Sequence, residues 1–168
     1  SGSSGSSVGS ISNSGTISAS NGAAINIQSG SSITGNIENN GVAALISGST
    51  GIYVTNGSIG GSITNSGTIT STSSWGTGIY LTGSTVAGDI SNDVSSTISG
   101  GTASGAGIRI SGSTVTGGIF NSGTISSVTG VSISSGSTVT GGITNEAGGT
   151  ISGSSHGILF LSAARQAV

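Results

Sequence analysis

The sequence predicts an all-β fold: a parallel β-helix of about six coils, with about 26 residues in each coil. Three observations predict this fold: a phrase recurs along the whole chain, side-chain character alternates with period two, and an Asn recurs at one place in every repeat. The crossover rule for parallel strands predicts a right-handed winding. No linker divides the repeats, so we expect a single repeat domain over residues 1–168.

The composition excludes several classes of protein. The chain has 168 residues, of which 34 are Gly, 40 are Ser and 21 are Thr, and only six residues carry a formal charge. Such a composition is typical of flexible linkers, but 22 Ile and 10 Val supply strand formers that disordered chains lack. A net charge of −2 provides no basic field for nucleic acid or for an anionic membrane. No apolar run reaches the roughly 18 residues of a membrane helix, so we expect no membrane insertion by this segment.

The first repeated phrase carries an Ile, an Asn and then a second Ile. Its opening Ile residues are 24 to 29 positions apart. The copies are ISNSGTIS at 11–18, IENNGVAA at 37–44, ITNSGTIT at 63–70, ISNDVSSTIS at 90–99, IFNSGTIS at 119–126 and ITNEAGGTIS at 143–152.

A second phrase, of the form GIxI, alternates with the first. Its copies are AINIQ from 24, GIYVT from 51, GIYLT from 78, GIRIS from 107, GVSIS from 130 and GILFL from 157.

Each unit is predicted to contain three short strands, GIxI, TVxGGI and GTIxS. Apolar or small residues keep strict period two over residues 115–125, which is the pattern of a strand with one buried face. The pattern breaks at the GST step between Ile110 and Val115, and again before each GIxI phrase, so we expect corners there. Inward Gly residues are expected to mark gentler bends; they lie at positions 35, 61, 88, 117 and 141.

A column of Asn residues is the strongest indication of parallel stacking. Stacked Asn side chains can hydrogen-bond from coil to coil and pair the amides of a bent backbone. A sandwich or barrel of antiparallel hairpins is the alternative, but a fixed register over six units favours parallel coils. With coils ~4.8 Å apart, the rod would be on the order of 29 Å long. The predicted ladder consists of Asn13, Asn39, Asn65, Asn92, Asn121 and Asn145.

The repeated phrase resembles the passenger regions of Gram-negative autotransporters. The phrase is V-T-G-G-I-x-N-S-G-T-I, followed by a short loop and G-I-x-[ILV], and the likeness extends from Val8 to about Leu161. The resemblance implies an extracellular or bacterial cell-surface β-helical adhesin or scaffold, attached to the outer membrane through a translocator outside this sequence. It implies adhesion, aggregation or fibre formation, with a host- or cell-surface protein or a glycan as partner.

Catalysis is not expected, and neither is a metal or cofactor site. His156 is the only His, and a Ser–His–Asp triad would need Asp89 or Asp93 from coils roughly 12 Å away along the rod. The two aspartates would lie ~13 Å apart in an extended strand, beyond the ~5–9.5 Å window of glycosidases. A polysaccharide-active β-helix is therefore the third-ranked function. Gly-rich phrases lack the Lys of a phosphate loop.

Candidate contact residues lie in a variable loop and in one outward column. Trp75 belongs to the long loop at 70–78 and would either offer a stacking platform or fold back to anchor its loop. Tyr53, Tyr80 and Arg109 share an outward column, as does Leu159, and this column would be either a contact strip or cross-coil packing.

The second-ranked function is an ice-binding module. Thr-x-Thr and Thr-x-Ser pairs recur in the repeats and would form a flat ladder, with a lapse at residues 42–44. The pairs are 16/18, 68/70, 97/99, 124/126 and 150/152.

Neither end of the sequence resembles a cap. The chain enters the first coil from SGSSGSS, and its last stretch is LFLSAARQAV, in which the part from Ser162 is too short for a capping helix. Uncovered strand edges are templates for further pairing. We therefore expect either a segment of a longer passenger or a subunit that associates end to end with copies of itself.

Overall fold

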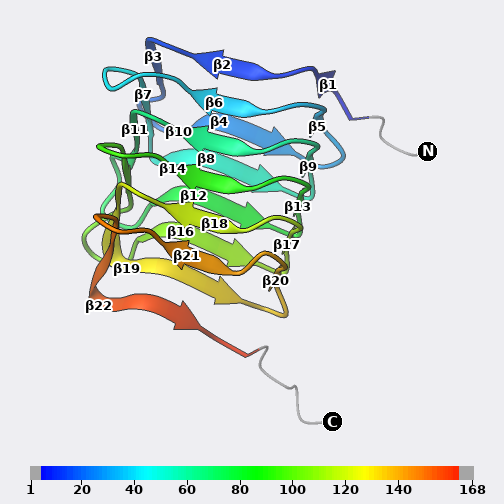
Figure 1. The fold of residues 1–168 in the computed structure, drawn as a ribbon. Coiled ribbons are helices and arrows are strands. Elements are labelled where there is room, and N and C mark those ends of the chain that lie inside the picture. Colours follow the sequence, from blue (N-terminus) through cyan, green and yellow to red (C-terminus); the bar gives the residue numbers. More distant parts are fainter. Residues whose placement is uncertain (1–4, 163–168) are drawn as a thin grey trace, which may run out of the picture.

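A computed structural model describes residues 5–162 of the chain; part of the predicted uncapped ends, residues 1–4 and 163–168, lies outside the described residues. The described part consists of strands and connecting loops, and every strand pair in it is parallel. The chain winds through about six turns of a β-solenoid, as predicted (Figure 1). Because residues 5–162 hold no helix, they hold none that is long and apolar enough to cross a membrane.

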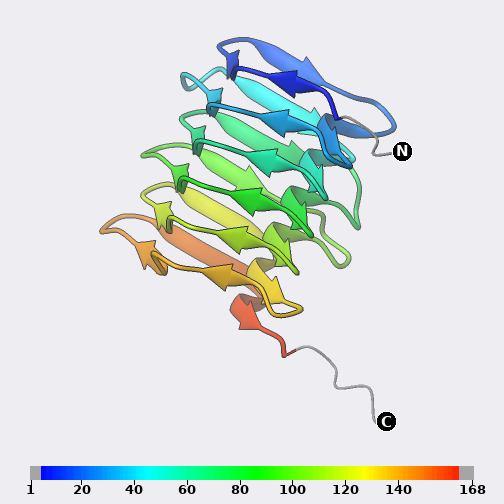
Figure 2. The ribbon, with the colours of Figure 1, turned by 90° about the vertical axis from the view of Figure 1, so that its right-hand side faces the viewer.

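Three parallel sheets form the walls of the rod. In Figure 2 the nearer strands point left and the fainter, more distant strands point right as the chain descends, which is a right-handed winding. Each coil adds one strand to each wall, so the strands of one wall come from successive repeats.

Sheet 1 contains the shortest strands, of two residues each. Its inward column consists of Val and Ile at the second position of each strand. The strands are β1 (Ser7–Val8), β5 (Ser32–Ile33), β9 (Ser58–Ile59), β13 (Thr85–Val86), β17 (Thr114–Val115) and β20 (Thr138–Val139).

Sheet 2 contains the Ile-x-Asn strands. In every pair Ile lies beside Ile and Asn beside Asn, so the register predicted from the repeat is confirmed. The strands are β2 (Ile11–Asn13), β6 (Ile37–Asn39), β10 (Ile63–Asn65), β14 (Ile90–Asn92), β18 (Ile119–Asn121) and β21 (Ile143–Asn145).

Sheet 3 has two arms. The first arm holds β3 (Thr16–Ser18), β7 (Leu45–Gly48), β11 (Thr68–Ser71) and β15 (Thr97–Ser99), and the second holds β4 (Ala23–Gln28), β8 (Thr50–Thr55), β12 (Thr77–Thr82) and β16 (Ala106–Ser111). The connection between arms is short in the last two coils, so β19 (Thr124–Ser134) and β22 (Thr150–Phe160) run through both.

The prediction that TVxGGI forms a single strand is wrong. The chain bends at the Gly-containing step, so TV joins sheet 1 and the following Ile joins sheet 2. The Gly residues predicted to mark bends lie at this corner, where each packs against the corresponding Gly of the preceding coil. A Cβ on Gly88 would lie 2.8 Å from the carbonyl carbon and oxygen of Gly61, so a side chain there would require the backbone to shift.

The corner predicted at the GST step is confirmed, and it uses the left-handed backbone region. Gly83 and Gly112 have φ of +58° and +57°, values that glycine adopts without steric cost. In other coils Asn56 (φ +50°) and Ser135 (φ +58°) take the same place. Asn tolerates this conformation better than most residues.

The second coil has a different register from the one expected. Residues 42–44 were predicted to replace the Thr-Ile-Ser of other coils, but they lie in a longer loop, and Val42 is exposed. Leu45, Ile46 and Ser47 instead pair with the Thr-Ile-Ser segment of β3 on one side and the Thr-Ile-Thr segment of β11 on the other. The loop of five residues between β6 and β7 causes this shift.

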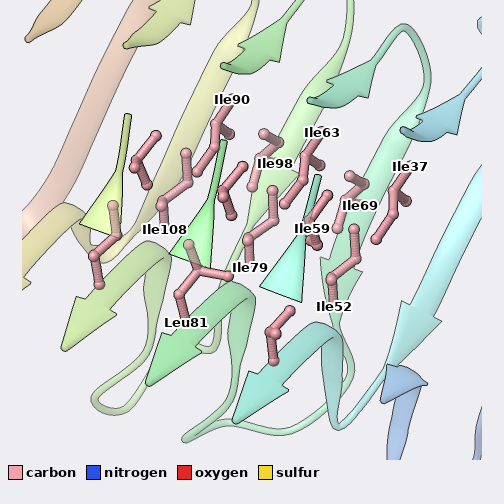
Figure 3. Packing of buried hydrophobic residues seen from close by; sticks show 14 of the residues in the cluster. Ile37, Ile52, Ile59, Ile63, Ile69, Ile79, Leu81, Ile90, Ile98 and Ile108 are labelled. Carbon is pink, nitrogen blue, oxygen red and sulfur yellow. The ribbon is translucent and has the colours of Figure 1, made fainter. Parts of the chain in front are cut away.

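The core is a set of stacked aliphatic columns, one from each strand position that faces inward. Residues Ile63, Ile79 and Ile108 have no exposed surface. Figure 3 shows how the columns of sheets 2 and 3 point toward one another. No single coil encloses its own Ile residues, so each coil depends on the coils above and below it.

Candidate functional site

The outward face of the second arm of sheet 3 carries an aromatic and cationic strip, defined here as Tyr53, Tyr80 and Arg109. Strand pairing places the three residues in one column, on β8, β12 and β16. The ring centroids of Tyr53 and Tyr80 are 5.2 Å apart, with the rings tilted by 32°. The guanidinium carbon of Arg109 lies 5.7 Å from the ring centroid of Tyr80, within the range of a cation–π contact. The predicted column therefore exists, and cross-coil packing holds it together.

The strip remains accessible although its members pack on one another. All three side chains are half-buried, whereas the inward residues between them are fully buried. Each of the three residues therefore keeps part of its surface in contact with solvent. The column continues to Asn26 above the strip, and to Ser132 and Leu159 below it.

Hydrogen bonds connect the strip to the loop that carries Trp75. Arg109 Nη2 donates to the carbonyl oxygen of Ser104, at 3.3 Å. Ala103 N donates to Ser74 O at 2.7 Å, so loop 100–105 stacks on loop 72–76. The chain thus brings Trp75 and the strip onto connected elements. Sequence reasoning missed Ser104, because a loop carbonyl oxygen leaves no signal in residue type.

Trp75 points away from the rod. Its side chain is 70% exposed, so it does not fold back to anchor its loop. The loop is held by other groups: Ser71 Oγ donates to the carbonyl oxygens of Ser49 and Ser73, at 2.8 and 3.0 Å. An exposed indole on a loop fixed by hydrogen bonds is available as a contact surface.

The six Asn residues predicted to stack form a continuous ladder inside the rod. In the first five coils the Asn Nδ2 donates to the Oδ1 of the Asn in the next coil, and all five of these distances are 2.8 Å. Asn65 Nδ2 also donates to the carbonyl oxygens of Gly67 and Thr97, both at 3.0 Å. The ladder therefore provides hydrogen-bond donors for backbone carbonyl oxygens at the corner between sheets 2 and 3. Its role is structural.

The two aspartates considered for catalysis form hydrogen bonds with different neighbouring coils. Asp89 Oδ1 accepts a hydrogen bond from Gly118 N in the following coil, at 2.9 Å. Asp93 Oδ2 accepts one from Ser66 Oγ in the preceding coil, at 2.5 Å. The two carboxylates flank β14 at opposite ends and interact in opposite directions along the rod.

His156 lies away from both aspartates. It is exposed on β22 in sheet 3, and its Nδ1 lies 2.9 Å from Ser155 Oγ. Within residues 5–162, no group of three or more His, Cys, Asp or Glu side chains has an arrangement that could hold a metal ion.

A Thr/Ser ladder lines the outward face of the first arm of sheet 3. Strand pairing aligns the Thr-x-Thr and Thr-x-Ser pairs of successive coils, with Leu45 as the one non-Thr/Ser residue in the column through Thr68 and Thr97. Thr70 Oγ1 and Ser99 Oγ are 2.7 Å apart, so adjacent members hydrogen-bond to each other.

No protein-family model, curated protein or solved structure matches the chain. The fold and the site are therefore defined by the geometry alone: a β-solenoid repeat protein with an internal Asn ladder and a half-buried aromatic and cationic strip on one side. The resemblance to autotransporter passengers stays a prediction.

Proposed function

We propose that this chain is a non-catalytic extracellular scaffold or adhesin of the autotransporter-passenger type, which binds a cell-surface glycan or protein through one side of the rod. The observation that carries the proposal is the half-buried strip of Tyr53, Tyr80 and Arg109, together with the exposed Trp75 on a loop that hydrogen bonds connect to the strip. Tyr, Trp and Arg are enriched in binding hot spots, because they combine apolar area with directional hydrogen-bond donors.

The rest of the rod suits a passive display role. Its outward residues are mostly small and polar, and its interior consists of aliphatic columns and hydrogen-bonded Asn. A rigid rod with one aromatic and cationic strip can hold a binding surface in a fixed orientation without catalysing a reaction. The proposal includes a location at a bacterial cell surface.

The proposal is tested by binding of the intact chain to cells and to arrayed glycans. We expect the double variant Tyr53→Ala/Tyr80→Ala to reduce binding at least tenfold, and Trp75→Ala to reduce it further. Thr82→Ala is the matched control, since Thr82 lies on the same face of β12 outside the strip. Equal binding by the parent, the control and the strip variants would refute the assignment.

The non-catalytic part of the proposal has its own test. A triple variant with His156→Ala, Asp89→Asn and Asp93→Asn should retain the full binding or aggregation activity of the parent. Turnover of a polysaccharide or ester that the triple variant loses would contradict this part.

A second candidate is ice binding, which the aligned Thr/Ser ladder of sheet 3 favours. The members repeat at the spacing of the coils, ~4.8 Å, on a nearly continuous row of parallel strands. Thermal hysteresis that Thr97→Leu abolishes, and that Tyr53→Ala/Tyr80→Ala leaves intact, would replace the adhesin proposal with this one.

A further inference from the structure

Within residues 5–162, the aliphatic core is open at the last coil. Inward residues of interior coils are fully buried, but Ile158 is 43% exposed and Phe160 is 68% exposed. A hollow of about 370 Å³ lies at this end, between Val139 of sheet 1, Ile143 of sheet 2 and Ile133, Ile158 and Phe160 of sheet 3. The last coil therefore presents the apolar columns of all three walls at one end of the rod.

The Asn ladder has a direction, and its two ends are complementary. Asn121 Nδ2 donates to Asn145 Oδ1, Gly123 O and Thr150 O. Asn145 Nδ2, within residues 5–162, donates only to Gly149 O. At the other end Asn13 Oδ1 accepts from Gly15 N and from no ladder amide of the described residues. The ladder thus ends in a donor at the last coil and in an acceptor at the first.

The inward columns of the two ends also correspond. Each strand position that faces inward in the last coil belongs to a column that starts in the first coil, so a first coil placed below the last one continues every column. The matched positions are Val139 with Val8, Ile143 with Ile11, Asn145 with Asn13, Ile151 with Ile17, Ile158 with Ile25 and Phe160 with Ile27.

The first coil offers no electrostatic barrier to this contact. Residues 5–36 contain no charged side chain, and Val8 at the edge of sheet 1 is 51% exposed. Strands with unpaired backbone groups at an edge pair readily with another strand.

We propose that the last coil binds the first coil of a second copy of this chain, head to tail, so that all three sheets and the Asn ladder run on from one copy into the next. The contact repeats the coil-to-coil interface found five times inside the chain. It is heterologous, because two different surfaces meet, and it does not close, so it generates a filament. This inference does not rest on the proposed function, since the strip lies on the side of the rod and the contact uses its ends.

The test uses one variant for each end. Phe160→Glu places a charge in the hollow of the last coil, and Val8→Glu places one at the edge of the first coil; both positions are exposed, so the variants should fold. Val94→Glu is the matched control, because Val94 is 72% exposed on a side loop. Circular dichroism and thermal unfolding check that each variant retains the parent's structure.

Sedimentation velocity over a wide concentration range gives the outcome. We expect the parent and Val94→Glu to form growing linear oligomers, and each end variant alone to stay monomeric. An equimolar mixture of the two end variants should form dimers and nothing larger, since only one pair of intact ends remains.

Three results would overturn the proposal. A parent that stays monomeric at high concentration excludes the contact. Dimers of Val8→Glu alone would show that two last coils meet each other. Loss of association in Val94→Glu would assign the contact to the side of the rod.

Discussion

Interior and terminal coils carry the same repeated phrase but differ in how much of it they bury. In the third coil, Ile63, Ile69 and Ile79 are fully buried and Asn65 has no exposed surface. In the sixth coil, Ile158 is 43% exposed and Asn145 is exposed. The difference shows that the aliphatic residues of a coil are buried by the neighbouring coils. The free energy of unfolding therefore depends more on the interfaces between adjacent coils than on each coil alone.

The largest expected effect is on the aliphatic columns. Ile79→Ala should lower the free energy of unfolding by about 2–5 kcal/mol, because it leaves a cavity between fully buried neighbours. Ile158→Ala, in the same column, should cost less than about 1 kcal/mol, since its side chain is already partly in water. Urea denaturation measures both values, and equal costs would contradict the comparison.

The Asn ladder should show the same contrast at a smaller magnitude. Asn65→Ala removes the donor to Asn92 Oδ1, Gly67 O and Thr97 O, and it should cost about 1–3 kcal/mol because the first two of these acceptors are buried. Asn145→Ala should cost less, since Asn145 is exposed. Thermal or chemical unfolding checks both, and Asn121→Ala should behave like Asn65→Ala. If Asn65→Ala and Asn121→Ala both have the same unfolding free energy as the parent, the ladder does not contribute buried hydrogen bonds and the predicted contrast is contradicted.

The last contrast concerns two glycines and is expected to differ in sign. Gly88→Ala should destabilise the chain by about 1–3 kcal/mol, because its Cβ would lie 2.8 Å from the Gly61 carbonyl group. Gly22→Ala should be neutral or stabilise by about 0.4–1 kcal/mol, since a Cβ there meets nothing within 4 Å and the unfolded chain loses freedom. Differential scanning calorimetry of the two variants gives the sign of each change, and a tolerated Gly88→Ala would show that the corner can open.

Much of the fold could be predicted from the sequence because the repeat fixes the register. Asn at one place in every unit allows only one alignment of the coils, and that alignment places Ile beside Ile in sheet 2. A bend that preserves the alternation of inward and outward residues is invisible to a period-two pattern, so the sequence could not separate TV from the Ile four residues beyond the Val. Loop length was also ambiguous in the second coil, where Leu45 replaces Thr and hides the true alignment.

The candidate site was predictable only in part. Equal spacing from the repeated phrase places Tyr53, Tyr80 and Arg109 in one column, and the structure confirms this. The contact of Arg109 with Ser104 O depends on the path of an irregular loop, for which the sequence has no periodicity. The exposure of Trp75 was equally unpredictable, because it also depends on an irregular loop. The hydrogen bonds of Ser71 hold that loop in place, so the indole is not needed as an anchor.

The stacking of coils through the Asn ladder is the central claim, and scalar coupling across hydrogen bonds tests it most directly. In a uniformly labelled sample, NMR should detect coupling from each Asn Nδ2 to the Cγ of the Asn in the next coil, for the pairs from Asn13 to Asn145. The side-chain amide protons of Asn39, Asn65 and Asn92 should also exchange slowly with water, because these residues are buried. Absent coupling together with rapid exchange of the Asn65 side-chain amide would contradict the ladder and the coil register built on it.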